Sequence, residues 1–138
     1  MADVSITAAN VVKGSDAVVV TRLAGAAITA GQTVYEDPND SNKFKLCDAD
    51  AGTATARTTR GIALNNAALN QPLVVQTGGR ITIGGTVVAG TVYVQSDTPG
   101  GIMPSADLEA GDYVTVLGIG VSATEIDVLI HASGVAAA

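Results

Sequence analysis

Aromatic residues and cysteine are scarce in this chain of 138 residues. It has one Phe, three Tyr and no Trp, so a hydrophobic core must be built mainly from Val, Ile, Leu and Ala. The single cysteine, Cys47, excludes an internal disulfide bond and a metal site made of several cysteines. Because 47% of the residues are apolar, the chain can still form one domain of ordinary size.

Basic residues are also few. Seven Lys and Arg stand against thirteen Asp and Glu, which gives a net charge of −6. Nucleic-acid-binding proteins need clustered basic side chains to displace counterions, and anionic membrane surfaces attract the same kind of cluster. We therefore expect no nucleic-acid partner and no membrane partner.

Long hydrophobic runs are absent. The most apolar segment, DAVVVTRLAGAAITAG, contains Arg22 and is too short to cross a bilayer. The first ten residues, MADVSITAAN, lack the basic and apolar regions of a secretory signal peptide. These features favour a soluble protein made in the cytoplasm.

Alternation of apolar and polar residues is the dominant pattern that is present. It recurs in short segments separated by Gly, Pro, Asn and Asp, as expected for strands with one buried face. Signals for helices are weak, and only short turns starting near Asp48 or at Ser105 are candidates. The sequence predicts an all-β fold, an antiparallel sandwich or barrel-like domain with roughly ten strands and at most one short helix.

An internal repeat is visible within this pattern. AGQTVYED at 30–37 resembles AGTVYVQS at 89–96, and each is followed by Gly-Ile and then by an apolar strand. The pattern predicts two copies, 30–79 and 89–134, with Tyr35 and Tyr93 at matched places. Coincidence in a chain rich in Ala, Gly and Val is the alternative. The predicted organisation is an N-terminal arm at 1–10, one β domain at 11–134 and a C-terminal tail at 135–138.

Two motifs suggest ligands but lack the structure that the ligands require. LGIGVSA at 117–123 matches a dinucleotide fingerprint, yet a strand-like segment follows it where a helix is needed. The segment from Asp37 to Asp48 resembles a calcium loop, but Asn42 stands where the loop needs Gly. The sequence therefore predicts no cofactor and no metal ion.

Catalytic candidates are equally sparse. His131 is the only histidine, and no second His, Ser or Cys is placed to act with it. Cys47 alternates with Phe44 and Leu46, so we expect a partly exposed thiol without an activating base. These residues predict a protein that is not an enzyme, with His131 at the surface or at a subunit interface.

Candidate partner contacts are therefore sought among exposed positions. Val4 and Ile6 alternate with polar residues, so the arm could pair as a strand with another chain or fold back on its own subunit. Tyr35 and Tyr93 either pack with their hydroxyls at the rim or anchor an interface. Together with His131, these are the residues that the sequence offers for contact with a partner.

Several segments carry a resemblance to a known family. They are the Gly61–Leu64 stretch before NQPLVVQTGG, then AGTVYVQS, PGGI, DLEAGDYVTVLGIG and the closing strand that ends in Ser133-Gly134. With these segments the chain resembles the capsid decoration proteins, or cement proteins, of tailed bacteriophages over roughly residues 20–135. Similar sequence patterns, rich in glycine and other small residues, occur in fibre and tail proteins of virions.

The resemblance implies an all-β domain that assembles as a homotrimer on the outer surface of the capsid. Its partner would be the major capsid protein, and its function would be to stabilise the shell. The protein would be made in the host cytoplasm and located in the virion. The alternatives are another virion component, such as a head fibre or tail protein, and a small bacterial β-barrel that binds a ligand or acts as an enzyme.

Overall fold

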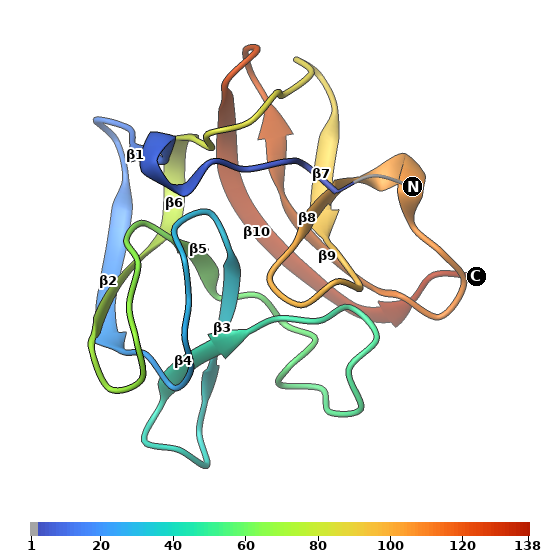
Figure 1. Cartoon of the computed structure of the whole chain (residues 1–138). Helices are drawn as coiled ribbons and strands as arrows, with labels where there is room; N and C mark the ends of the chain where they lie inside the picture. Colours follow the sequence, from blue (N-terminus) through green and yellow to red (C-terminus); the bar gives the residue numbers. More distant parts are fainter. Residues whose placement is uncertain (1–2) are drawn as a thin grey trace.

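The computed structural model describes residues 3–138, and its regular secondary structure is almost entirely antiparallel strands that form a strongly curled sheet (Figure 1). The strands are β1 (Val12–Lys13), β2 (Val18–Leu23), β3 (Thr33–Asp37), β4 (Lys43–Leu46), β5 (Gly61–Ala63), β6 (Pro72–Thr82), β7 (Val92–Gln95), β8 (Ile102–Pro104), β9 (Tyr113–Gly120) and β10 (Glu125–Ala136). Two short 3₁₀ turns, η1 (Ala8–Asn10) and η2 (Ser105–Asp107), are the helical elements of the described residues. The predicted all-β, barrel-like class is confirmed.

The order of the strands repeats within the sheet. Along the sheet it is β4-β3-β5-β6-β10-β9-β7-β8, with β1 and β2 pairing with β6 outside this path. Read from the middle outward, β6-β5-β3-β4 corresponds to β10-β9-β7-β8. Two halves with the same connectivity therefore meet where β6 pairs with β10.

Matched backbone contacts support this correspondence. Gly31 donates its N–H to the carbonyl of Ala63 at 2.8 Å, and Gly90 donates to Gly120 at 2.7 Å. Both donors have positive φ, 93° and 85°, a conformation that glycine adopts without strain. The repeat seen in the sequence thus corresponds to a repeat of turn geometry.

The two glycines of the Gly-Ile pairs also occupy equivalent places. A Cβ on Gly61 would collide with the carbonyl of Gln76 in β6, and a Cβ on Gly118 would collide with that of Asp127 in β10. Ala63 therefore corresponds to Gly120, 57 positions later. Gln76 corresponds to Asp127, 51 positions later. Glycine at each position lets the neighbouring strand approach closely.

The offset of 51 positions locates a local two-fold axis. Gly78 of β6 pairs with Leu129 of β10, and these residues are themselves 51 positions apart. The pair is therefore mapped onto itself when the halves are exchanged. In an antiparallel pair of equivalent strands, this places the axis at the Gly78–Leu129 pair.

The predicted match of the two tyrosines is wrong. Val34 pairs with Gly61, whereas Tyr93 pairs with Gly118, so the counterpart of Tyr93 is Val34. The first copy has one residue more between its turn glycine and its tyrosine. Because side chains alternate along a strand, this single residue moves Tyr35 to the opposite face of the sheet.

Two hydrophobic clusters fill the curled sheet, largely one for each half. The cluster of the first half contains Ala24, Ile28, Val34, Phe44, Ala63, Ala67, Leu73 and Val75. The larger cluster contains Val11, Ala30, Ile62, Ile81, Ile83, Val87, Tyr93, Ile102, Leu117, Ile126 and Val128. Aliphatic side chains dominate both clusters, as the scarcity of aromatic residues predicts.

Both chain ends differ from the predicted arm and tail. Val4 and Ile6 are half-buried against the larger cluster, and the N–H of Val4 donates to the carbonyl of Ile102 in β8 at 2.7 Å. The segment therefore folds back on its own subunit, which is the alternative left open by the sequence (Figure 1). At the other end, β10 continues beyond 134 to Ala136, and Ala137 donates to Asp112 at 2.7 Å.

Within residues 3–138, no helix has the length and apolar character that a membrane span requires. The turn predicted at Ser105 is present as η2, whereas the segment after Asp48 forms an irregular loop up to β5.

Candidate interaction surface

The residues predicted to contact a partner do not come together in the structure. Val4 and Ile6 cover the chain's own core, and Tyr93 is 2% exposed. The hydroxyl of Tyr93 accepts a hydrogen bond from the N–H of Val88 at 2.9 Å, so its polar end is satisfied inside the chain. Of the five candidates, His131 is exposed, and Tyr35 is half-buried at the side of an open groove.

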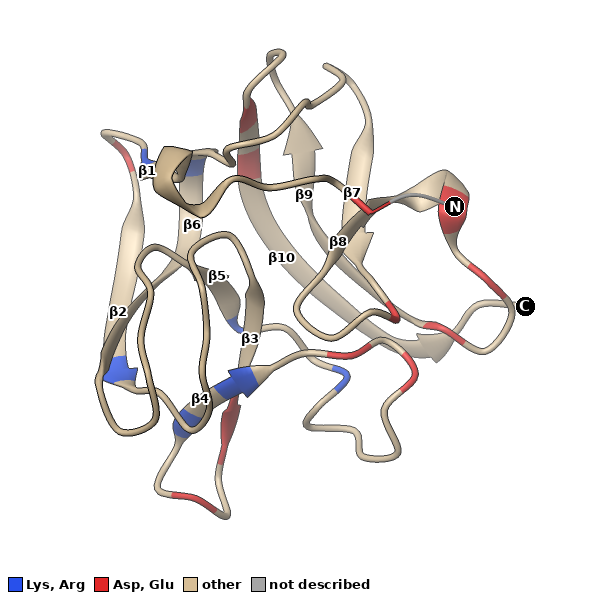
Figure 2. Ribbon diagram, in the orientation of Figure 1, with Lys and Arg blue, Asp and Glu red and all other residues tan. Residues whose placement is uncertain are grey.

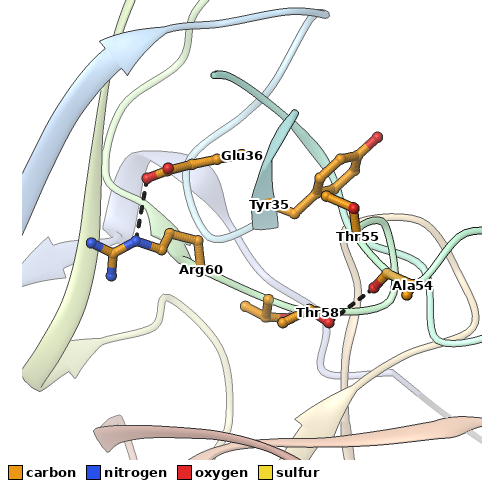
Figure 3. A pocket seen from close by; sticks show the side chains of 7 residues that line it. Tyr35, Glu36, Ala54, Thr55, Thr58 and Arg60 are labelled. Carbon is orange, nitrogen blue, oxygen red and sulfur yellow. Dashed lines mark hydrogen bonds and ion pairs between the residues drawn. The ribbon is translucent and has the colours of Figure 1, made fainter. Parts of the chain in front are cut away.

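Tyr35 lines an open groove of about 410 Å³ beside the loop that precedes β5 (Figure 3). Thr55 and Thr58 lie across from it, and Arg60 and Glu36 form an ion pair at its edge at 3.2 Å. Glu36 also contacts Arg22 at 3.2 Å. Because two guanidinium groups hold this carboxylate, it is poorly placed to act as a general base.

Cys47 is fully buried, so the prediction of a partly exposed thiol is wrong. Its N–H donates to the carbonyl of Thr33 at 3.1 Å, and its carbonyl accepts from Gly100 at 2.7 Å. These bonds turn the residue inward just beyond the end of β4. Burial raises the pKa of the thiol to about 12.

We expect Cys47 to resist alkylation in the folded protein. At about pH 8, a pKa near 12 leaves about one thiol in ten thousand ionised, and burial also blocks access. Mass spectrometry after iodoacetamide treatment should show an unmodified chain without denaturant and complete modification in guanidinium chloride. Rapid labelling of the folded protein would contradict the buried position.

The segment that resembles a calcium loop consists of the polar turn between β3 and β4 and of β4 itself. The Nζ of Lys45 lies 2.7 Å from a carboxylate oxygen of Asp37 and 3.2 Å from one of Asp40. Lysine pairing lowers the pKa of Asp37, with its hydrogen bond to Lys45 as the largest cause. Among residues 3–138, no group of three or more His, Cys, Asp or Glu could hold a metal ion.

The lack of a metal requirement remains a prediction with a direct test. Because Lys45 takes the place of a cation beside Asp37, chelation should leave the fold unchanged. The melting temperature measured with EDTA should equal that measured with added calcium. A decrease of several degrees in EDTA that calcium restores would show that a metal ion stabilises the chain.

Asp48 lies at the start of the loop between β4 and β5 with Asp50 and Asp97 nearby. Burial, followed by the hydrogen bond with Asp50 and repulsion from these carboxylates, raises the pKa of Asp48 to about 6. In the unfolded chain the pKa would be near 3.8. The protonated group therefore stabilises the fold at low pH, and this contribution is lost as the pH rises through about 6.

Asp48→Asn should remove this dependence on pH. At about pH 7 the variant should be more stable than the unchanged protein, by about 1 kcal/mol more than at about pH 4. The expected difference is no larger because solvent screens part of the effect. Urea unfolding at both pH values measures the difference. Glu109→Gln removes an exposed negative charge and controls for net charge. If the free energies of unfolding of the variant and the unchanged protein differ by the same amount at both pH values, the pH dependence does not come from Asp48.

Charge is distributed unequally between the two halves (Figure 2). All seven Lys and Arg lie at or before Arg80, together with seven of the thirteen acidic residues. Residues 81–138 contain six Asp and Glu and no Lys or Arg, so they carry the whole net charge of −6. The first part of the chain is neutral, and the second part is acidic.

Exposed apolar side chains gather on two strands. In β2, Val18 is 59% exposed and Val19 is 40% exposed, and the pairing with β6 is irregular between these two residues. In β10, Leu129 is 58% exposed and Val135 is 63% exposed. His131 lies between these two residues, opposite Val116 of β9. We call the β2 residues 18–23 and the β10 residues 129–136 the two exposed strands.

Sequence reasoning missed these strands as surfaces. Alternation along Val18–Thr21 predicts an ordinary strand with one buried face, because alternation does not show whether a sheet continues beyond a strand. The glycine at position 78 was a signal that could have been used. It has no side chain to cover its neighbours, and it pairs with both Val18 and Leu129.

No protein-family model and no curated protein matches this chain.

Proposed function

We propose that the chain is a structural protein of a bacteriophage virion, which binds the outer surface of the capsid and stabilises the shell. The proposal includes assembly as a homotrimer, contact with the major capsid protein and no catalytic activity. It combines the family resemblance with the surface described above.

The observation that carries the proposal is the large number of exposed apolar side chains. Ten large hydrophobic residues among residues 3–138 are at least 36% exposed, and five of them lie on the two exposed strands. Exposed apolar side chains that gather into a patch are typical of contacts between proteins. The groove at Tyr35 is open to solvent. Its carboxylate, Glu36, is paired with Arg22 and Arg60, and this pairing does not suit a general base.

The segments that carry the resemblance also supply the framework of the fold. PLVVQTGG begins β6, AGTVYVQS contains β7, and the GDYVTVLGIG stretch forms β9. A rigid domain built on such a framework could join neighbouring capsid subunits without a ligand pocket. With many copies bound to one shell, contacts that are individually modest would together stabilise the shell substantially.

Binding to capsids tests the proposal directly. Purified protein should sediment with empty shells assembled from the major capsid protein of the same genome, reach saturation and raise the temperature at which the shells open. Protein that stays in the supernatant at all shell concentrations would exclude the capsid role. Labelling of virion tails rather than heads by antibody in electron micrographs would assign the chain to a tail component instead.

A further inference from the structure

Strand edges provide the starting point, because an unpaired edge exposes a row of N–H and carbonyl groups that can pair with another chain. In the part of the chain that the structure describes, β4 and β8 lie at the two ends of the strand order. Each is partly covered by the chain itself. Gly25 donates to Phe44 of β4 at 2.7 Å, and Val4 donates to Ile102 of β8 at 2.7 Å.

Besides the two-residue strand β1, which pairs with β6 alone, two edges remain open among the described residues. The first is the outer edge of β2, whose six residues pair with β6 on one side. The second is the end of β10 at 130–136. Pairing of β10 with β6 stops at Leu129, whereas its pairing with β9 continues to Ala136. The open edges are thus of nearly equal length.

Neither open edge is well protected by charge. Edge strands that must remain unpaired usually carry Lys, other charged residues or Pro. Arg22 is the only charged residue of β2, and the 130–136 segment has no Lys, Arg, Asp or Glu. Figure 1 shows β2 at one border of the sheet and the end of β10 at the opposite side, so the two edges of one molecule do not meet.

Charge favours contact between unlike edges over contact between like ones. A contact between two β10 edges would bring together the acidic parts of two copies, each with a charge of −6 over residues 81–138. A contact between β2 and β10 instead joins the neutral part of one copy to the acidic part of the next. Arg22, the charged residue of β2, is paired with Glu36 of its own chain, so this contact brings no unpaired charge to the acidic part.

We propose that β2 of one copy pairs edge to edge with residues 130–136 of β10 in a second copy. This inference rests on the oligomeric part of the proposed function and not on capsid binding. Since the two edges are different, each copy uses one to hold its left neighbour and the other to hold its right neighbour. Such a contact closes into a ring when the rotation between copies allows it.

Cross-linking of a mixture of two variants tests the pairing. Thr21→Cys and Ala132→Cys each place an exposed thiol on one of the edges, and the buried Cys47 stays inert. With a short bismaleimide, the mixture should give cross-linked dimers, whereas each variant alone should not. Cross-linking of Thr21→Cys alone would show that β2 pairs with β2. No cross-linking in the mixture would also overturn the proposal.

A charge placed on the edge provides a second measurement. Val19→Lys should weaken self-association at least roughly tenfold, so that light scattering gives a mass near that of the 13.7 kDa chain. Val88→Lys is the matched control, because Val88 is exposed but lies outside the strands. Equal association of both variants would overturn the proposal.

Capsid sedimentation with the same preparations separates the two ideas. If the unchanged protein is oligomeric but the Cys variants do not cross-link, the interface is wrong and the oligomer stands. If the unchanged protein is a monomer even on shells that it binds, both the interface and the trimer are wrong while the capsid role stands. If an oligomer with cross-linked β2 and β10 does not bind shells, only the capsid role fails.

Discussion

Deletion of residues 2–9 is expected to lower the free energy of unfolding by about 4 kcal/mol, because the deletion removes two half-buried side chains and two long-range backbone hydrogen bonds. Val4 and Ile6 pack on the larger hydrophobic cluster. Val4 donates to Ile102 at 2.7 Å, and Thr7 donates to Gly84 at 2.9 Å. The deletion also uncovers the edge of β8. Urea unfolding followed by circular dichroism measures the loss.

Two point variants show whether the loss comes from packing. Ile6→Ala should cost about 1–2 kcal/mol, since Ile6 is only half-buried. The exposed neighbour Ser5→Ala should change stability by less than about 0.5 kcal/mol. A truncated protein with unchanged stability that no longer assembles would instead show that the segment contacts another chain.

The second large effect is expected at the matched glycines. Gly61→Ala and Gly118→Ala should each lower the free energy of unfolding by about 3 kcal/mol, because the added methyl group meets a backbone carbonyl that cannot move without disturbing its strand. The carbonyls belong to Gln76 and Asp127. Chemical unfolding of both variants provides the comparison.

Gly52→Ala is the control for this pair. No atom lies within 4 Å of a Cβ built at Gly52, so its substitution should change stability by less than about 0.5 kcal/mol. Similar losses at Gly61 and Gly118 would agree with their equivalence in the two halves. A harmless substitution at either position would show that the strands are farther apart than described.

The strands and the repeat could be predicted from the sequence because both leave local signals. Alternation marks segments such as β9, and the paired Gly-Ile motifs mark the strands that approach a neighbour closely. The match of Tyr35 with Tyr93 failed for a different reason. Sequence similarity aligned the tyrosines, whereas the structure aligns the turn glycines at 31 and 90. The first copy has one extra residue between its turn glycine and its tyrosine, and this residue moves Tyr35 to the opposite face of the sheet.

Features that depend on contacts between distant parts of the chain could not be predicted from local alternation. Alternation along β4 predicts the face of Cys47 only while the strand lasts, and the chain turns inward directly after Leu46. The N-terminal segment looks like a strand, but alternation does not reveal which edge it covers. The open edges of β2 and β10 depend on where pairing with β6 stops, and this is a property of the whole sheet.

The local two-fold axis at Gly78 and Leu129 has a consequence for how the chain reaches its fold. During synthesis, β6 leaves the ribosome about fifty residues before its equivalent strand β10, as their pairing shows. Until β10 arrives, the nascent first half exposes the edge that the second half will occupy. An equivalent strand from a neighbouring nascent chain has a similar shape and could take that place. Closure of the sheet is therefore the step at which swapping of halves between chains competes with correct folding.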